Sequence, residues 1–245
     1  MPIPEAVPPN CPPGLQYLTA VDRLLIQQMI ELLEMFTGFE TNNQYVVRNA
    51  MGFQIYFALE DTPPCMRFCC GSGRAFFIHL IDNCRQEVMR LHRPFKCCAV
   101  VANCSGCCAG ASRCCAHEVF VEAPPGQLIG MVHQIFGCCD TKLLITDANG
   151  APQVKVQEGP NCCTIGCCEK CCDIEFPVTT LDGRKIGEIR KMYSGYIQEQ
   201  YTDADNFGVT FPVDLDVRVK ACLLAATFLI DFMHFESSPQ QNTAY

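Results

Sequence analysis

Six consecutive segments of the sequence share one pattern, and that pattern limits the fold more than any other feature. In each, two short stretches rich in β-branched and aromatic residues flank a turn sequence such as "NAMG", "DNCRQ", "APPG" or "DANG". The segments are "QYVVRNAMGFQIYFALED", "RAFFIHLIDNCRQEVMRLHRPF", "HEVFVEAPPGQLIGMVHQIF", "TKLLITDANGAPQVKVQEG", "CDIEFPVTTLDGRKIGEIRKMY" and "YIQEQYTDADNFGVTFPVDLDVRVKA". Such a series is typical of β-hairpins and predicts about twelve strands in an all-β sandwich or barrel. Large antiparallel sheets commonly remove their edges by closing, which favours a barrel.

The most apolar run of the chain, "VKACLLAATFLIDFMHFE" at residues 219–236, predicts a helix for which two placements are open. A membrane span needs about 20 predominantly apolar residues, whereas a run of roughly 10–14 is more often a buried core helix. Asp231 interrupts the run, which disfavours a membrane span. Basic residues precede the run, as they would on the cytoplasmic side of a span. A barrel of this size needs a filler, so we expect the helix in its core, with Asp231 and His234 near the barrel mouth.

The segment before the first hairpin, "TAVDRLLIQQMIELLEMFTGFE", predicts an additional N-terminal amphipathic helix. Thr19 and Asp22 resemble a capping box, and Gly38 follows as a stop signal. Apolar residues recur at helical spacing: Leu18, Val21, Leu25, Met29, Leu32 and Phe36.

These patterns divide the chain into three parts. Residues 1–14 contain six prolines and are expected to form a short extended tail. Residues 15–237 form one barrel domain, and residues 238–245 form a polar tail. The net charge of -8 disfavours bulk attraction to nucleic acid. The N-terminus shows no pattern of a signal peptide, so we expect the chain to stay in the cytosol, where disulfides are rare.

Cysteine is the outlier of the composition, with 21 residues, and two clusters stand out. The first cluster leaves three uses open: acylation, metal binding or no chemistry. Acylation fits cysteines near membrane-facing segments, and the C-x₂-C spacing of two members fits zinc. Adjacent Cys-Cys pairs depart from a zinc pattern, because neighbouring side chains of a strand point to opposite faces. The first cluster consists of Cys97, Cys98, Cys104, Cys107, Cys108, Cys114 and Cys115.

The second cluster is interpreted first as inert strand or loop cysteines, with a metal site, Zn²⁺, as the alternative. Its members are Cys162, Cys163, Cys167, Cys168, Cys171 and Cys172. Cys168 and Cys171 have the spacing of a zinc ligand pair.

The acidic stretch "TDADNFGVTFPVDLD" is a second candidate site. Set against a twelve-residue calcium loop, Asp203 takes position 1, Asp205 position 3 and Asp214 position 12. Phe207 stands where an oxygen ligand is expected. The residues alone therefore favour an acidic turn between strands over a calcium site, and any calcium affinity is expected at the weak end, roughly 10⁻⁴–10⁻³ M.

Four stretches of the sequence resemble a known family. "GLQYLTAVDRLLIQQMIELLEMFTGFETNNQY", "FVEAPPGQLIG", "YTDADNFGVTFPVDLDVRVKA" and "FLIDFMHFES" are similar to the phospholipid scramblases. The resemblance implies a tubby-like fold, a closed twelve-stranded antiparallel barrel around a hydrophobic C-terminal helix. It also implies calcium-activated exchange of phospholipids between bilayer leaflets without ATP. The implied calcium residues are Asp203, Asp205, Phe207, Val209, Phe211 and Asp214.

The resemblance further implies acylation within the Cys97–Cys115 segment and attachment to the cytoplasmic face of the plasma membrane or another cellular membrane. A nuclear pool is implied through "GEIRKMYSGY", where only Arg190 and Lys191 are basic. The expected partners are a phospholipid membrane and unidentified proteins, not nucleic acid. No motif for bond-making chemistry is present, so an enzyme is not expected. The competing hypothesis is a lipidated adaptor or regulatory module, with or without metal in its cysteine clusters, that moves no lipid.

Overall fold

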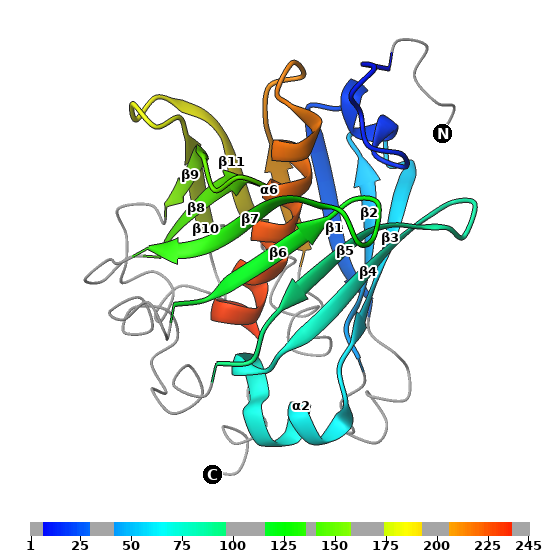
Figure 1. Ribbon diagram of the computed structural model, residues 1–245, viewed down its shortest axis with the longest axis vertical. Helices are drawn as coiled ribbons and strands as arrows, with labels where there is room; N and C mark the ends of the chain where they lie inside the picture. The colour runs from blue at the N-terminus through cyan, green and yellow to red at the C-terminus, as the bar shows by residue number, and fades with distance from the viewer. Residues whose placement is uncertain are drawn as a thin grey trace.

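The computed structural model describes residues 7–29, 42–96, 116–135, 141–157, 174–192 and 206–236. Its strands form one closed antiparallel barrel in which each strand lies beside its neighbours in the sequence and β1 closes on β12 (Figure 1). The mainly β class and the twelve-stranded barrel are confirmed. The strands are β1 Arg23–Met29, β2 Gln44–Asn49, β3 Gln54–Asp61, β4 Phe76–Asp82, β5 Glu87–Arg93, β6 Glu118–Glu122, β7 Leu128–Ile135, β8 Lys142–Asp147, β9 Pro152–Gln157, β10 Ile174–Thr179, β11 Lys185–Met192 and β12 Asn206–Thr210.

The closing strand β1 corrects the extent of the expected N-terminal helix. A short 3₁₀ helix, η1, covers Gln16–Ala20, but Arg23–Met29 is extended and pairs with both β12 and β2. Leu24 and Ile26 point inward and are buried, as the period of two in a strand requires. Residues 30–41, the second half of the expected helix, lie outside the described residues.

The two ends of the barrel differ, and we name them by their connections. At the turn end, β2–β3, β4–β5, β6–β7, β8–β9 and β10–β11 are joined by short turns. Asn49, Asp82 and Asp147 open three of these turns, and the side chain of each accepts hydrogen bonds from two backbone N–H groups within the turn. Such local bonds explain why the sequence predicts these hairpins. The alternate connections begin and end at the opposite end, which we call the cysteine end.

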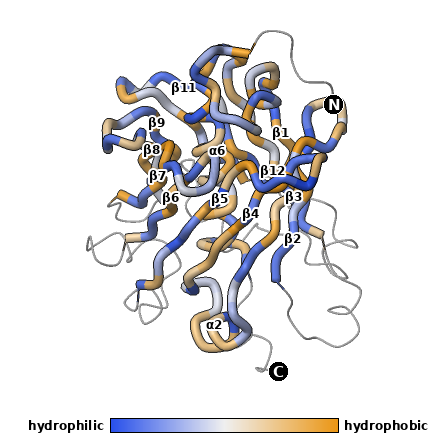
Figure 2. Tube along the Cα trace, turned by 45° about the vertical axis from the view of Figure 1, so that its right-hand side comes forward, coloured by the Kyte–Doolittle hydropathy of each residue, from blue (hydrophilic) through white to orange (hydrophobic). Residues whose placement is uncertain are grey.

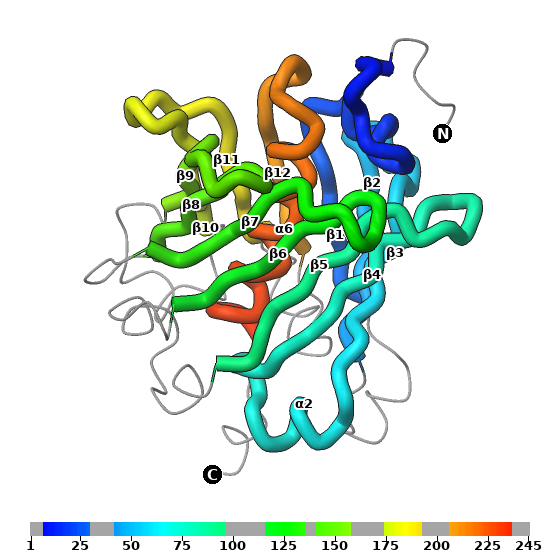
Figure 3. The backbone as a smooth tube through the Cα atoms, viewed as in Figure 1, coloured from blue at the N-terminus to red at the C-terminus, as the bar shows by residue number. Residues whose placement is uncertain are grey.

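The C-terminal helix fills the barrel along its axis, as Figure 3 shows. It comprises α6, Val217–Ile230, and the π-helical turn η4, Asp231–Phe235. Every residue from 219 to 233 is buried, so the helix is enclosed on all sides. Its apolar stretch lies within a wall whose strands alternate between hydrophobic and polar residues (Figure 2). Gly130 of β7 allows close approach, since a Cβ there would lie 2.6 Å from the Cys222 Sγ.

The polar residues of this helix are satisfied inside the barrel. Asp231 is 2% exposed and accepts a 2.6 Å hydrogen bond from the Tyr45 hydroxyl. The Thr227 hydroxyl donates to the Leu223 carbonyl oxygen. Asp231 therefore does not meet solvent at the barrel mouth, in contrast to the expectation. Among the described residues, no helix combines the length and apolar character needed to cross a membrane.

The described part of the N-terminal tail packs against the turn end. Pro12 and Leu15 are buried, and the Gly14 carbonyl oxygen accepts a hydrogen bond from the Tyr56 hydroxyl at 2.8 Å. The tail is thus already part of the barrel packing before residue 15.

Candidate functional site

Three residues of the predicted calcium motif belong to the barrel wall. Phe207 and Val209 lie in β12, and both side chains are buried in the core. Phe211 is also buried, and its backbone N–H donates to the Asp22 carbonyl oxygen at 3.0 Å. Because β12 pairs with β1 on one side and β11 on the other, its backbone carbonyls face strand partners. These residues therefore build the core and the wall.

Asp214, the last residue of the motif, lies at the turn end, between β12 and α6. Its side chain is exposed, and together with Asp216 it lines a groove of about 680 Å³. Asp216 also caps α6, because its carboxylate accepts the Arg218 backbone N–H at 2.7 Å. This groove is where the described part of the motif could offer carboxylate oxygens to a cation.

The extended form of β12 separates the two halves of the motif. At about 3.3 Å per residue, Asn206–Thr210 spans roughly 13 Å. Asp203 and Asp205 precede the strand and lie outside the described residues, whereas Asp214 follows it. Calcium ligands lie about 2.3–2.6 Å from the ion, so the length of β12 favours ligands drawn from one side of the strand. The calcium site stays a prediction.

A buried ammonium group holds the turn that carries Asp214. Lys220 of α6 is 0% exposed, and its Nζ donates to the carbonyl oxygens of Leu18 (2.9 Å), Val21 (2.9 Å) and Val213 (2.7 Å). Burial lowers the pKa of Lys220 below its ordinary value. This cage ties the core helix, the segment before β1 and the Asp214 turn together.

The first cysteine cluster, Cys97–Cys115, lies outside the described residues, but both ends of its connection are described. The Lys96 Nζ donates to the Ala116 carbonyl oxygen at 2.8 Å and pairs with the Glu118 carboxylate at 3.0 Å. The Arg93 guanidinium donates to the His117 Nδ1 at 2.8 Å. Because burial, and then the charge of Arg93, lower the pKa of His117 to about 3, this imidazole is neutral. These contacts hold together the two segments between which the connection runs, residues 93–96 and 116–118. We call this junction the neck.

The connectivity brings most cysteines to one end of the barrel. The second cluster, Cys162–Cys172, also lies outside the described residues, in the connection between β9 and β10. Apart from Cys11, Cys84 and Cys222, every cysteine of the sequence falls in a connection that begins and ends at the cysteine end. Within the described residues, no group of three metal-ligating side chains converges. The acylation and zinc hypotheses therefore both stay predictions.

A buried charged network fixes the core helix at the cysteine end. The Arg74 guanidinium contacts the Glu60 carboxylate at 2.7 Å and the Glu236 carboxylate at 2.5 Å. Burial alone raises the pKa of Glu60, but hydrogen bonds and charge from Arg74 outweigh it and lower the pKa. Arg74 also lies over the Phe232 ring. We did not predict this network, because Glu236 is remote in sequence from Glu60 and Arg74, and only the charge of Glu60 within the apolar strand β3 could have indicated it.

The basic pair in the segment implied for nuclear import lies in β11. Lys191 is 8% exposed, with its Nζ 3.9 Å from the centre of the Phe235 ring. Arg190 pairs with Glu175 and Glu188 on the outer surface. In the folded barrel, the Lys191 ammonium therefore does not lie on the surface that an import receptor would contact.

Comparisons with known proteins place these features in a family. The sequence profile of the Scramblase family matches residues 1–237. The chain is 47% identical to phospholipid scramblase 1 of Mus musculus over 96% of the chain and 67% of that protein. It is 46% identical to phospholipid scramblase 1 of Homo sapiens over 98% of the chain and 71% of that protein. It is 47% identical to phospholipid scramblase 2 of Bos taurus over 96% of the chain and 75% of that protein.

No solved structure matches the chain significantly. The family match covers all described strands and the core helix, and it supports a scramblase function. The chain belongs to the phospholipid scramblase family.

Proposed function

We propose that the chain is a calcium-responsive phospholipid scramblase that moves phospholipids between bilayer leaflets without ATP and makes or breaks no covalent bond. The observation that carries the proposal is the family match over residues 1–237. Relatives that carry the name phospholipid scramblase align over nearly the whole chain.

The filled barrel limits where such exchange can take place. The core helix is buried on all sides from Val219 to Met233, and its polar side chains bond within the barrel. Passage through the interior would require the helix to leave and would expose Lys220 and Asp231 to lipid, at a cost of several kcal/mol. We therefore place lipid exchange at the outer surface of the barrel.

Calcium dependence is proposed to arise at one end of β12. Asp203 and Asp205 precede β12 in the sequence, and Asp214 lines the groove at the turn end; the calcium ligands would come from one of these two sets. A site at the cysteine end would lie closest to the cysteine connections, whereas a site at the turn end would act on the turn held by Lys220.

Attachment to the membrane is proposed to use acylated thiols of Cys97–Cys115, on the cytoplasmic face of a cellular membrane. Several acyl chains anchor a protein firmly, whereas one chain holds it only weakly. The neck at Lys96 and Ala116 joins this connection to the barrel, so acylation there would bring the cysteine end to the bilayer.

A second candidate function is a lipidated adaptor that binds membranes and partner proteins, with or without bound zinc or a nuclear pool, and moves no lipid. The filled interior favours it, because no lipid path through the barrel is present in the described residues. Metal analysis of the purified chain tests the zinc form of this alternative.

Reconstitution into vesicles separates the two functions. A fluorescent phospholipid in both leaflets is quenched from outside, and calcium-dependent loss of the protected fraction reports exchange. Asp203→Ala with Asp205→Ala tests one end of β12, Asp214→Ala tests the other, and Asp61→Ala, an exposed acid on β3, is the control. Calcium-dependent exchange that one end variant abolishes supports the scramblase. Absence of exchange in the acylated wild type, with membrane attachment intact, supports the adaptor.

A further inference from the structure

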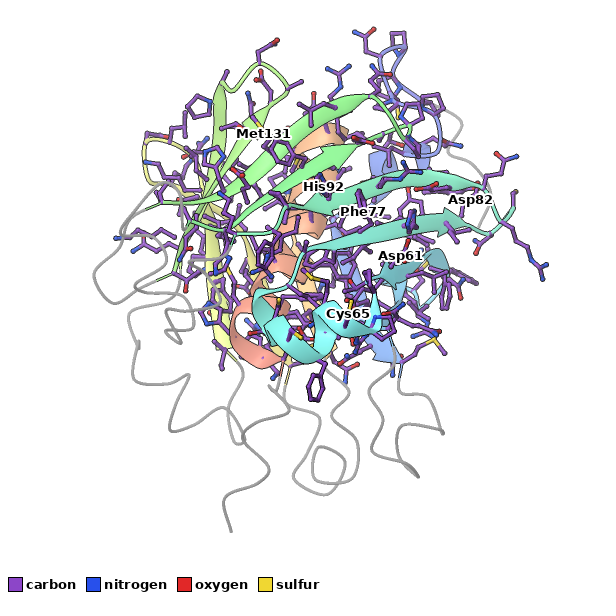
Figure 4. The ribbon with its side chains drawn as sticks, turned by 60° about the horizontal axis from the view of Figure 1, so that its bottom comes forward. Asp61, Cys65, Phe77, Asp82, His92 and Met131 are labelled. Atoms are coloured by element: carbon purple, nitrogen blue, oxygen red, sulfur yellow. The ribbon has the colours of Figure 1, made fainter. Side chains whose placement is uncertain are left out.

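The helix α2, Pro64–Cys70, presents an uncharged face to solvent at the cysteine end. Phe68 is 82% exposed, the highest value among the exposed large hydrophobic residues of the described chain. Cys65 and Cys69 are exposed free thiols. The spacing of these three residues places them on one face of the helix. Figure 4 shows Cys65 on α2 at this end of the barrel.

This face is held outward by contacts on the opposite side of α2. Arg67 is buried and donates hydrogen bonds to the Asn42 side chain (3.1 Å) and the Glu60 carboxylate (3.5 Å). The helix ends where the Gly71 backbone N–H donates to the Arg67 carbonyl oxygen. Because Arg67 is anchored, the Phe68 ring does not reach the core without unfolding the helix.

The same helix is joined to the neck of the first cysteine connection. The Arg93 guanidinium donates to the Ser72 carbonyl oxygen, directly after α2, at 2.9 Å and to the His117 Nδ1 at 2.8 Å. Two further aromatic residues near this junction are exposed: Phe77, the second residue of β4, and Phe95, which follows β5 by two residues. A membrane reached through acylation of the cysteine connection would therefore lie against α2 as well.

We propose that the outer face of α2, formed by Cys65, Phe68 and Cys69, docks directly into the lipid bilayer. This inference rests on the proposed membrane function and adds a second contact to it, distinct from Cys97–Cys115. An uncharged tip with one aromatic ring inserts into the interfacial region without a matching pocket. A protein partner would need about 800 Å² of complementary surface, far more than one face of a seven-residue helix offers.

Thiol reactivity maps the docked face without altering the chain. The full, unacylated protein is alkylated with a water-soluble maleimide, with and without phosphatidylcholine–phosphatidylserine vesicles, and each cysteine is quantified by mass spectrometry. We expect Cys65 and Cys69 to react several-fold more slowly on vesicles. Cys84, an exposed thiol at the turn end, serves as the internal control and keeps its rate. If vesicles do not slow the reaction of Cys65 and Cys69 relative to that of Cys84, the proposal is overturned. Absence of vesicle binding by the wild type overturns it as well.

A pair of matched variants tests the aromatic ring. Phe68→Ser is expected to weaken vesicle partition about tenfold or more, as expected for loss of one buried aromatic side chain. Phe53→Ser, at the turn end and 57% exposed, should leave partition unchanged. Thermal unfolding verifies that both variants fold, and equal partition of the two variants overturns the proposal.

Calcium-dependent lipid exchange by the acylated wild type is measured in vesicles of the same composition to separate this inference from the proposed function. Protection of Cys65 and Cys69 in the unacylated protein, without exchange by the acylated protein, contradicts the scramblase function and supports the docking face. Exchange without protection of these thiols defeats the docking face and keeps the function.

Discussion

The two ends of this barrel hold the same helix in different ways. At the turn end, one ammonium group, from Lys220, lies among three backbone carbonyl oxygens, and short turns close the wall. At the cysteine end, ionised side chains surround the helix terminus, with Arg74 between Glu60 and Glu236. The connections whose sequence holds most of the cysteines begin and end there, and the exposed α2 face lies there as well. The comparison indicates that the turn end maintains the fold, while the cysteine end combines the buried charged network with the surface that we propose meets lipid.

The largest expected effect comes from removing the cation of the buried charged network at the cysteine end. Arg74→Met removes the nearer cation of the buried Glu60 carboxylate and leaves it the 3.5 Å contact to Arg67. It also removes the cation from the partly buried Glu236, so the free energy of unfolding should fall by about 3–5 kcal/mol. Arg90→Met is the control, because its pair with Glu87 is partly exposed and contributes about 1 kcal/mol or less. Urea titration measures the free energy of unfolding of both variants. Similar losses for the two would show that the buried charged network does not hold the helix.

Acidification should weaken the cysteine end selectively. Burial lowers the pKa of His117 to about 3 and that of His234 to about 4. The unfolded chain binds these protons near pH 6.5 and the folded chain does not, so stability falls as pH drops below about 6.5. Between pH 7 and pH 5, we expect each histidine to lower the unfolding free energy by about 2 kcal/mol.

Two variants assign this pH dependence. His117→Gln and His234→Gln, alone and combined, are unfolded in urea at pH 7 and pH 5. Each substitution should remove the part of the fall in unfolding free energy between pH 7 and pH 5 that its histidine causes. If the double variant keeps the full wild-type difference between the two pH values, the histidines do not carry it.

The turn end is tested by removing its buried ammonium. Lys220→Met leaves three carbonyl oxygens without a donor, and the free energy of unfolding should fall by about 3 kcal/mol. Lys185→Met, on the exposed surface of β11, should change it by less than about 0.5 kcal/mol. An Lys220→Met variant as stable as Lys185→Met would mean that the cage contributes nothing to this end.

The smallest expected effect concerns the approach of the helix to the wall. In Gly130→Ala, the Cβ would meet the Cys222 Sγ at 2.6 Å and the Thr146 carbonyl oxygen at 2.7 Å, costing about 1–3 kcal/mol. Gly208→Ala in β12 is the matched control, since its Cβ would meet only the Met192 Sδ at 3.8 Å. Thermal unfolding of both variants should separate them, and equal midpoints would refute close contact between α6 and β7.

The comparison also explains what the sequence could predict. The turns opened by Asn49, Asp82 and Asp147 are fixed by bonds within a few residues, so the first five hairpins are predicted correctly. Within the described residues, the sixth segment contributes one strand, β12, which pairs with β11 and β1. β1 is missed because Leu18, Val21, Leu25 and Met29 follow a helical period, while pairing with the remote β12 makes the segment extended.

The conformation of the acidic motif could not be predicted for a similar reason. The acidic motif resembles a loop by spacing, but barrel pairing stretches its centre into β12, with Phe207 and Val209 in the core. The partners of Lys220 and Arg74 lie far from them in sequence, so no local pattern indicates either group. The face of α2 escapes prediction because the burial of Arg67 alone decides which side points outward.

The central claim is that phospholipid meets the outside of the cysteine end and never the barrel interior. Photoactivatable phospholipid, cross-linked during calcium-dependent exchange and mapped by mass spectrometry, tests it directly. We expect adducts on α2, at or next to Phe68, and none on the core helix between Leu223 and Ile230. Adducts on that stretch of α6, with α2 unlabelled, would contradict it.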